Sequence, residues 1–194
     1  MRQLLHLLAG CALLAIVSGC GSHEASPPVA ACSGGQQSAG FRCYSGAYLS
    51  FARPRSWKPR HYEVVSSFST VLVYLSNQLL HDPCRRSSSA ITCASPLQRL
   101  RRGGVLVEWD EGGMPGWTLG RPDGTIGGLS ARVQFSRPSA ACRHIGGTRT
   151  VRAVTARRLP HTFYSLDACL RGPHVRAAEH QLRLLLQSTR FVQD

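Results

Sequence analysis

The stretch Leu129-Ser130-Ala131-Arg132-Val133-Gln134-Phe135-Ser136 decides the fold class of this chain. Its apolar and polar residues alternate without exception, so an extended strand here has one apolar and one polar face. Such alternation is typical of an antiparallel sheet that has one face on the core and the other in water. Residues 148–157 repeat the period, and residues 162–170 follow as a further strand. Because short turns join these segments, the sequence predicts an antiparallel sheet.

Strand patterns also occur earlier in the chain. Residues 41–53 are rich in aromatic residues and are followed by a proline, which is typical of the end of a strand. Residues 61–68 and 70–75 are predicted as two strands, and the second is an almost continuous apolar run. Residues 105–110 alternate and lead into a glycine-rich turn at 111–116.

Two further predictions concern the segments between these strands. Residues 79–96 contain Pro83, a serine run and two cysteines, and are predicted as a surface loop tied at its base. Trp57 lies between two prolines, and an isolated tryptophan of this kind more often fills a core than supports a ligand.

One helix is predicted, close to the C-terminal end. Gly172-Pro173 provides its start, because proline is tolerated in a first helical turn. The apolar stripe consists of Val175, Ala178, Leu182, Leu185, Leu186 and Thr189. On the opposite side, Glu179 and Arg183 are spaced for an i,i+4 ion pair. The apolar stripe needs an apolar partner, so the predicted fold class is α+β, an antiparallel sheet packed against a C-terminal amphipathic helix.

The N-terminal segment has the three parts of an export signal. A positive start is followed by an apolar core over residues 4–17 and by the small residues Ser18 and Gly19. The apolar core is shorter than the roughly 20 residues that a transmembrane helix requires. An ordinary cleaved signal peptide is one interpretation of this segment.

The run Leu13-Leu14-Ala15-Ile16-Val17-Ser18-Gly19-Cys20 favours another interpretation, because it resembles a bacterial lipobox. The resemblance implies cleavage before Cys20 and a diacylglyceryl thioether on its sulfur. A lipid anchor of two or more acyl chains would hold the protein stably at a membrane. The expected location is therefore the extracytoplasmic side of a cell membrane or cell envelope.

These features divide the chain into three parts. Residues 1–19 are predicted to be a lipoprotein signal peptide, and residues 20–40 a flexible tether, because large apolar residues are scarce there. Residues 41–194 are predicted to form one disulfide-linked α+β domain. About 150 residues suffice to bury a core without a metal.

Six cysteines lie outside the signal peptide and the predicted lipidation site: Cys32, Cys43, Cys84, Cys93, Cys142 and Cys169. They form no C-x-x-C pair of the kind that structural zinc sites favour. Export would place them in an oxidising compartment, where disulfides persist. Several connectivities are open, and pairing of sequence neighbours is the simplest: Cys32 with Cys43, Cys84 with Cys93, and Cys142 with Cys169.

The chain is strongly basic. It carries 23 basic residues, of which Lys58 is the single lysine, against 10 acidic residues, giving a formal net charge of +13. Arginine suits phosphate and carboxylate partners, so one interpretation is a surface that binds anionic lipid or polymer. The other interpretation is codon bias in a GC-rich genome. The arginines are scattered, and the densest cluster is Arg99 with Arg101 and Arg102, so no nucleic acid partner is expected.

Glu108, Asp110 and Glu111 form the densest acidic group, at the point where a strand meets a glycine-rich turn. If Glu108 and Asp110 share a strand face, they provide a carboxylate pair for acid/base work or for a hard cation. A solvated hairpin end that pairs with arginine explains them equally well. One hypothesis is therefore an envelope hydrolase or metal-dependent enzyme that uses Glu108, Asp110 and a loop histidine.

Other chemical motifs are missing from the sequence. It contains no nucleophile elbow, phosphate-binding loop, zinc-protease motif or dinucleotide fingerprint. The histidines outside the signal segment have no metal-binding helical spacing, and a disulfide at Cys84 would remove the thiolate nearest to His81. The sequence therefore predicts no catalytic residue, metal or cofactor with any specificity.

The order of the elements resembles the PsbP-like class of small α/β sandwich domains, which recur among exported bacterial lipoproteins. The resemblance rests on a strand ending in Pro54 and Trp57, a meander of strands, and a final helix running into Ser188-Thr189-Arg190-Phe191. It covers residues 41–194 and departs from the class in the six cysteines and the long tied loop. It implies a non-catalytic binding or assembly domain, and the leading hypothesis is thus an envelope lipoprotein that binds a partner protein or an anionic surface.

Overall fold

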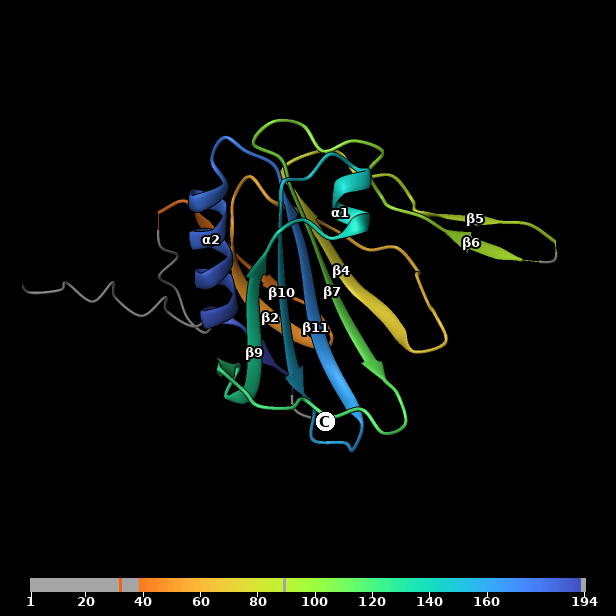
Figure 1. The fold of residues 1–194 in the computed structure, drawn as a ribbon, viewed down its shortest axis with the longest axis vertical. Helices are drawn as coiled ribbons and strands as arrows, with labels where there is room; N and C mark the ends of the chain where they lie inside the picture. The colour runs from red at the N-terminus through yellow and green to blue at the C-terminus, as the bar shows by residue number, and fades with distance from the viewer. Residues whose placement is uncertain (1–31, 33–38, 89, 193–194) are drawn as a thin grey trace, which may run out of the picture.

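A computed structural model describes residue 32, residues 39–88 and residues 90–192. Figure 1 shows a sheet of strands with one helix on each side of it. In chain order the first elements are β1 (Phe41–Ser45), β2 (Leu49–Pro54), β3 (Lys58–Arg60), β4 (Ser69–Ser76), β5 (Cys84–Arg86), β6 (Ile91–Cys93) and β7 (Val105–Gly113). The remaining elements are β8 (Gly124–Ile126), β9 (Leu129–Ser136), α1 (Ala140–His144), β10 (Arg149–Ala156), β11 (Thr162–Leu170), α2 (Val175–Ser188) and β12 (Arg190–Phe191).

A seven-stranded antiparallel sheet organises the fold. Its strand order is β3-β4-β7-β11-β10-β9-β8, and the central pairs β7 with β11 and β10 with β11 run over their full lengths. A smaller antiparallel sheet of order β1-β2-β12 lies beside α2. The predicted fold class, an antiparallel sheet packed against a C-terminal helix, is confirmed.

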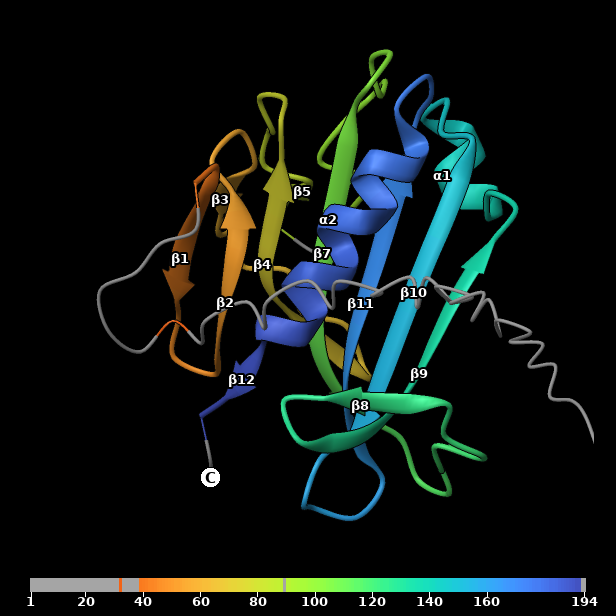
Figure 2. The same cartoon turned by 90° about the vertical axis from the view of Figure 1, so that its left-hand side faces the viewer.

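The main core lies between the large sheet, α2 and the small sheet. Alternate residues of the strands point into it, including Val107 and Trp109 of β7 and Leu166 of β11, all fully buried. Figure 2 views the molecule from this side and shows α2 lying across the sheet. Trp57 is also buried in this core, as predicted.

Helix α2 presents the predicted stripe to the sheet. Its buried residues are Ala178, Leu182, Leu185, Leu186 and Ser188. The Ser188 hydroxyl accepts a hydrogen bond from the backbone N–H of Ala52 in β2 at 2.9 Å, which ties the end of the helix to the small sheet. The predicted partner of Glu179 is corrected: its carboxylate pairs with Arg149 of β10 at 2.6 Å, because the helix packs against that strand. Arg183 instead lies over the ring of Phe135.

A second, smaller core lies on the opposite face of the large sheet. It consists of Tyr74, Leu80, Leu97, Leu100, Leu106, Cys142, Ile145 and Cys169. Short helix α1 covers this face, and we call it the α1 face. Figure 1 shows α2 on one side of the sheet and the β5–β6 hairpin extending away on the other.

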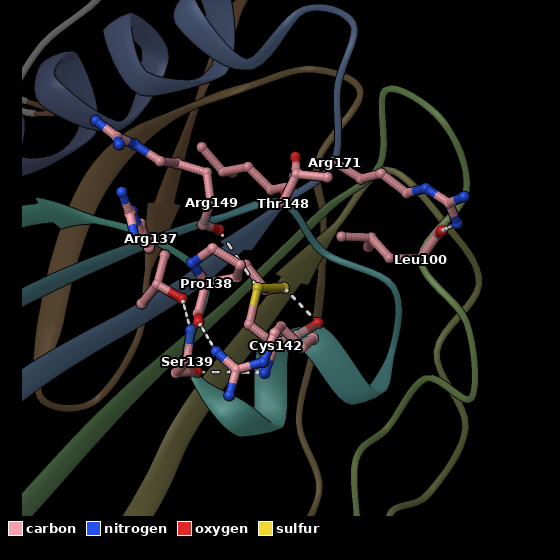
Figure 3. Close-up of a disulfide and its surroundings, with 12 residues drawn as sticks. Leu100, Arg137, Pro138, Ser139, Cys142, Thr148, Arg149 and Arg171 are labelled. Carbon is pink, nitrogen blue, oxygen red and sulfur yellow. Dashed lines mark hydrogen bonds between the residues drawn. A yellow bond between two sulfur atoms is a disulfide. The ribbon is translucent and has the colours of Figure 1, made fainter.

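The three predicted disulfides are present: Cys32–Cys43, Cys84–Cys93 and Cys142–Cys169. The third joins α1 to the end of β11 and is drawn in Figure 3. Gly147 lies directly against it, and a Cβ atom at this position would overlap both sulfur atoms. Glycine is therefore required where the chain passes the disulfide.

Several predicted segments differ from the structure. Residues 41–53 form two paired strands, β1 and β2, where one element was predicted. Residues 79–96 contain the β5–β6 hairpin where a surface loop was predicted, with Cys84 directly opposite Cys93. The predicted strand at 61–68 is absent, because its pairing with the edge of β4 is limited to an isolated bridge from Val65 to Thr70 and a few backbone hydrogen bonds beside it. Residues from this segment, Tyr62 and Val64, pack against the second core instead.

The described part of the chain includes no helix that is both long and apolar enough to span a membrane. The predicted signal peptide, the lipidation site Cys20 and most of the predicted tether lie outside the described residues.

Candidate functional site

The strand register brings polar side chains into one line across the α1 face. Tyr74 lies opposite Glu108, Glu108 opposite Asp167, Asp167 opposite Arg152, and Arg152 opposite Gln134. Directly opposed residues in an antiparallel sheet share a face, so these five residues form a row over β4, β7, β11, β10 and β9. We call this set the lateral row.

Glu108 and Asp110 lie on the same face of β7, as the carboxylate-pair hypothesis requires. Leu106, two residues earlier in the same strand, belongs to the second core, whereas Val107 and Trp109 belong to the main core. Asp110 is 8% exposed, and neither carboxyl group belongs to an ion pair among the described residues.

Burial and mutual repulsion change the acidity of this pair. Burial, followed by the charges of Glu108 and Asp167, raises the pKa of Asp110 to about 8. Burial and the Asp167 charge also raise the pKa of Glu108, and a hydrogen bond with Asp110 opposes that rise. With a pKa near 8, Asp110 keeps its proton at neutral pH and shares a hydrogen bond with the Glu108 carboxyl group.

The two neighbours of Glu108 in the lateral row differ in charge state. Burial, and then the charges of Glu108 and Asp110, raise the pKa of the Tyr74 hydroxyl, which stays neutral. Asp167 accepts a hydrogen bond from Nε of Arg152 at 2.9 Å and is paired with that cation. The Arg152 charge is thus engaged by Asp167, and Glu108 has no cation of its own among the described side chains.

A cleft of about 450 Å³ opens over this part of the sheet. Glu108, Asp167 and Arg152 line it together with Tyr74, and the apolar side chains of Val64 and Leu106 border it. Its remaining walls come from α1, from residues 93–96 at the base of the β5–β6 hairpin and from the Cys142–Cys169 disulfide. The cleft therefore combines apolar surface with a carboxyl group, that of Glu108, which has no cation partner in the described part of the chain.

Glu111, the third residue of the predicted acidic group, lies apart from the other two. Strand alternation turns it to the opposite face of the sheet, and its carboxylate accepts a hydrogen bond from Arg157 at 3.0 Å. The strand extends to Gly113, so Glu111 belongs to β7 and not to a turn. The acidic group is thus a carboxylate pair with Asp167 as its third neighbour.

The described histidines lie away from the carboxylate pair. His61 contacts the backbone oxygen of Leu72, and His161 the backbone oxygen of Trp117, and no histidine lines the cleft at Glu108. Among the described residues, no group of three or more histidine, cysteine, aspartate or glutamate side chains is arranged to hold a metal ion.

Sequence reasoning missed Asp167, Arg152 and Tyr74 as members of the site. Asp167 and Arg152 occupy polar positions of predicted strands, which is a visible signal for their face, whereas Tyr74 belongs to the almost continuous apolar run at 70–75, which carries no such signal. The neighbours of all three across the sheet depend on strand order and register, which alternation alone does not give.

Comparisons of the chain with protein-family models, with curated proteins and with solved structures gave no match. The chemistry of the site must accordingly be inferred from its own residues.

Proposed function

We propose that this protein is a lipid-anchored domain of the cell envelope that binds a cationic ligand in the cleft on the α1 face, without catalysis. The Glu108–Asp110 carboxyl pair, which has no cation partner among the described residues, supports this proposal most directly. Separating a carboxylate from water is unfavourable unless a cation or hydrogen-bond donors compensate it. An amine or guanidinium group placed beside Glu108 would provide that compensation.

The lining of the cleft indicates the rest of the ligand. Val64 and Leu106 offer apolar contact, and the ring of Tyr74 lies next to Glu108 in the lateral row, where it can face a cation. Ligand pockets in proteins usually have volumes of about 300–1,000 Å³ and combine apolar walls with a few polar groups. The cleft suits a small ligand with a cationic head and an apolar body.

Benzamidine and benzamide provide a test, because they have nearly the same shape and only benzamidine is a cation. We expect benzamidine to bind in an NMR titration and benzamide to bind at least about tenfold more weakly, since hydrogen bonds to charged groups are the stronger kind. Glu108→Gln should reduce benzamidine affinity by about tenfold or more. Glu63→Gln is the matched control, because Glu63 is an exposed acid that is paired with Arg86 and is not among the residues that line the cleft.

The same titration has an expected pH dependence. A cation stabilises the ionised form of the carboxyl pair, so its affinity should rise as Asp110 loses its proton. The rise should lie between about pH 6 and about pH 9, around the pKa of Asp110 near 8. Benzamidine keeps its charge over this range. Equal affinities for benzamidine and benzamide, or an unchanged affinity after Glu108→Gln, would exclude the cleft as a cation site.

Acid/base chemistry by Glu108 and Asp110 is a second candidate function. The raised pKa of Asp110 favours it, because catalytic acids often titrate near neutral pH. The described part of the cleft lacks the histidine that this hypothesis requires. Binding without turnover is therefore the better supported proposal.

The membrane anchor is proposed from the lipobox resemblance at Cys20, and the disulfides agree with an oxidising compartment. Cys20→Ala should shift the protein from the membrane fraction to the soluble fraction and remove the lipid mass. Fractionation together with intact-mass spectrometry measures both effects. Ser22→Ala is the control, two residues away, and should leave lipidation unchanged. An unlipidated Cys20→Ala protein that stays with the membrane as firmly as the wild type would contradict the anchor.

A further inference from the structure

A second cavity, of about 680 Å³, lies at the end of the sheet where β4 and β11 end and β7 begins. Residues 78–81 and 97–102 form its walls together with Arg171. This cavity does not share a lining residue with the cleft at Glu108. It is therefore a separate site.

The charge of this cavity is positive throughout. Arg99, Arg101, Arg102 and Arg171 line it, and no aspartate or glutamate is found among the described residues of its lining. The ion pairs found among the described residues involve other arginines. The densest arginine cluster of the sequence is thus joined by a fourth guanidinium from a distant strand end.

Hydrogen bonds hold the arginine-bearing loop in place. Arg171 donates to the backbone oxygen of Leu100 at 2.6 Å, a contact visible in Figure 3. The side chain of Gln78 accepts from the backbone N–H of Arg101 at 2.8 Å, and that of Asn77 donates to the oxygen of Gly103 at 2.9 Å. Leu97 and Leu100 anchor the loop in the second core. The guanidinium groups therefore extend from a fixed backbone, which reduces the entropic cost of gathering them around an anion.

Arginine in such a cluster matches one ligand chemistry well. The guanidinium group donates two parallel hydrogen bonds to phosphate oxygens, and several such groups balance the charge of one phosphate. Leu79 at the border is 68% exposed and places an apolar side chain beside the cations. This combination matches a phosphate group that carries an organic substituent.

We propose that this cavity binds a phosphate-bearing ligand of the kind found in anionic lipid headgroups. The ligand can be presented at a membrane surface or free in solution, and the chemistry of recognition is the same. This site is independent of the cleft at Glu108, so an experiment that rejects binding at one site leaves the proposal for the other unaffected.

Two binding assays separate the two sources. The full chain carrying Cys20→Ala is mixed with phosphatidylglycerol vesicles, with phosphatidylcholine vesicles as the reference of zero net charge, and cosedimentation is measured. The same protein is titrated in solution with glycerophosphoglycerol, with glycerol as the uncharged reference. Saturable binding of glycerophosphoglycerol assigns the site to the free headgroup, and binding confined to phosphatidylglycerol vesicles assigns it to a membrane surface.

A matched pair of double variants tests whether the cavity itself binds. Arg99→Ala with Arg102→Ala removes two charges from the cavity, and Arg85→Ala with Arg121→Ala removes two exposed charges elsewhere. We expect the first variant to lose about tenfold or more in affinity and the second to stay within about twofold of the wild type. All four side chains are exposed, so unfolding temperatures should be unchanged. Equal losses of affinity in both variants would mean that binding depends on the net charge of the protein and not on this cavity, and would overturn the proposal. The absence of binding in both assays would overturn it as well.

Discussion

Replacing Cys142 and Cys169 together by alanine is expected to lower the free energy of unfolding by about 4 kcal/mol. The disulfide closes a segment with a sequence separation of 27, and the chain-entropy model assigns about 3.5 kcal/mol to a loop of that length. Both cysteines are buried in the second core, so the substitution also removes packing contacts. Urea unfolding monitored by tryptophan fluorescence measures the change.

The Cys84→Ala with Cys93→Ala variant is the control for this prediction. Its disulfide has a sequence separation of 9 and belongs to a hairpin that extends away from the sheet. We expect it to cost at most about 2.5 kcal/mol, because the closed loop is shorter. A loss from the hairpin variant that equals or exceeds the loss from the buried pair would contradict the assignment of stability to the α1 face.

Leu182→Ala is expected to destabilise the protein by about 3 kcal/mol, within the usual range for buried leucines. Leu182 is fully buried where α2 lies against the sheet, and the truncation leaves a cavity in the main core. For a domain of this size the loss corresponds to a fall of roughly 10 °C in the unfolding temperature. Differential scanning calorimetry measures both quantities.

Gln187→Ala in the same helix is the matched control. Gln187 is exposed, and its substitution also yields alanine, so helix propensity changes little. We expect a change of at most about 0.5 kcal/mol. A similar loss of unfolding free energy in both variants would mean that α2 stabilises the protein through its helical structure and not through the apolar face that packs on the sheet.

Alternation and helical spacing were sufficient to predict β9, β10 and α2, which border the main core. Leu129–Ser136 forms β9 with Ala131 buried, and the helical stripe around Leu182 and Leu185 lies on the sheet. These segments each have one face on the core, so the burial pattern is encoded locally. The predicted pairing of neighbouring cysteines was also correct. The two cysteines of each disulfide are separated by 11, 9 and 27 positions in the sequence, so each disulfide joins segments that are close along the chain.

The β5–β6 hairpin could not be predicted from alternation. Neither face of this hairpin packs on a core, since its strand residues are exposed: Arg85, Arg86, Ile91 and Thr92. Its sequence therefore needs no alternation of apolar and polar residues. The error at residues 61–68 has the opposite cause. Its apolar residues Tyr62 and Val64 pack on the second core from a segment whose pairing with β4 is limited to an isolated bridge, so partial burial occurs without a regular strand.

The candidate site was half predictable. The spacing of Glu108 and Asp110 places both on one face of a strand, and the structure confirms that placement. Asp167 lies 57 positions beyond Asp110, and it reaches the pair because β11 lies beside β7 in the sheet. The arginine cavity likewise depends on Arg171, which follows β11 and lies beside a loop that precedes β7. Local sequence patterns carry no information on such neighbours.

The make-up of the lateral row would make binding of the proposed cation a reporter of folding. Its residues come from five strands spread between Tyr74 and Asp167, so an unfolded or fragmented chain cannot assemble them. A cation held by the row binds the native state alone, and at a hundredfold excess over its dissociation constant it would stabilise that state by about 2.7 kcal/mol. Ligands for the cleft can therefore be sought among compound collections by the rise in melting temperature that they cause, before any assay of activity exists.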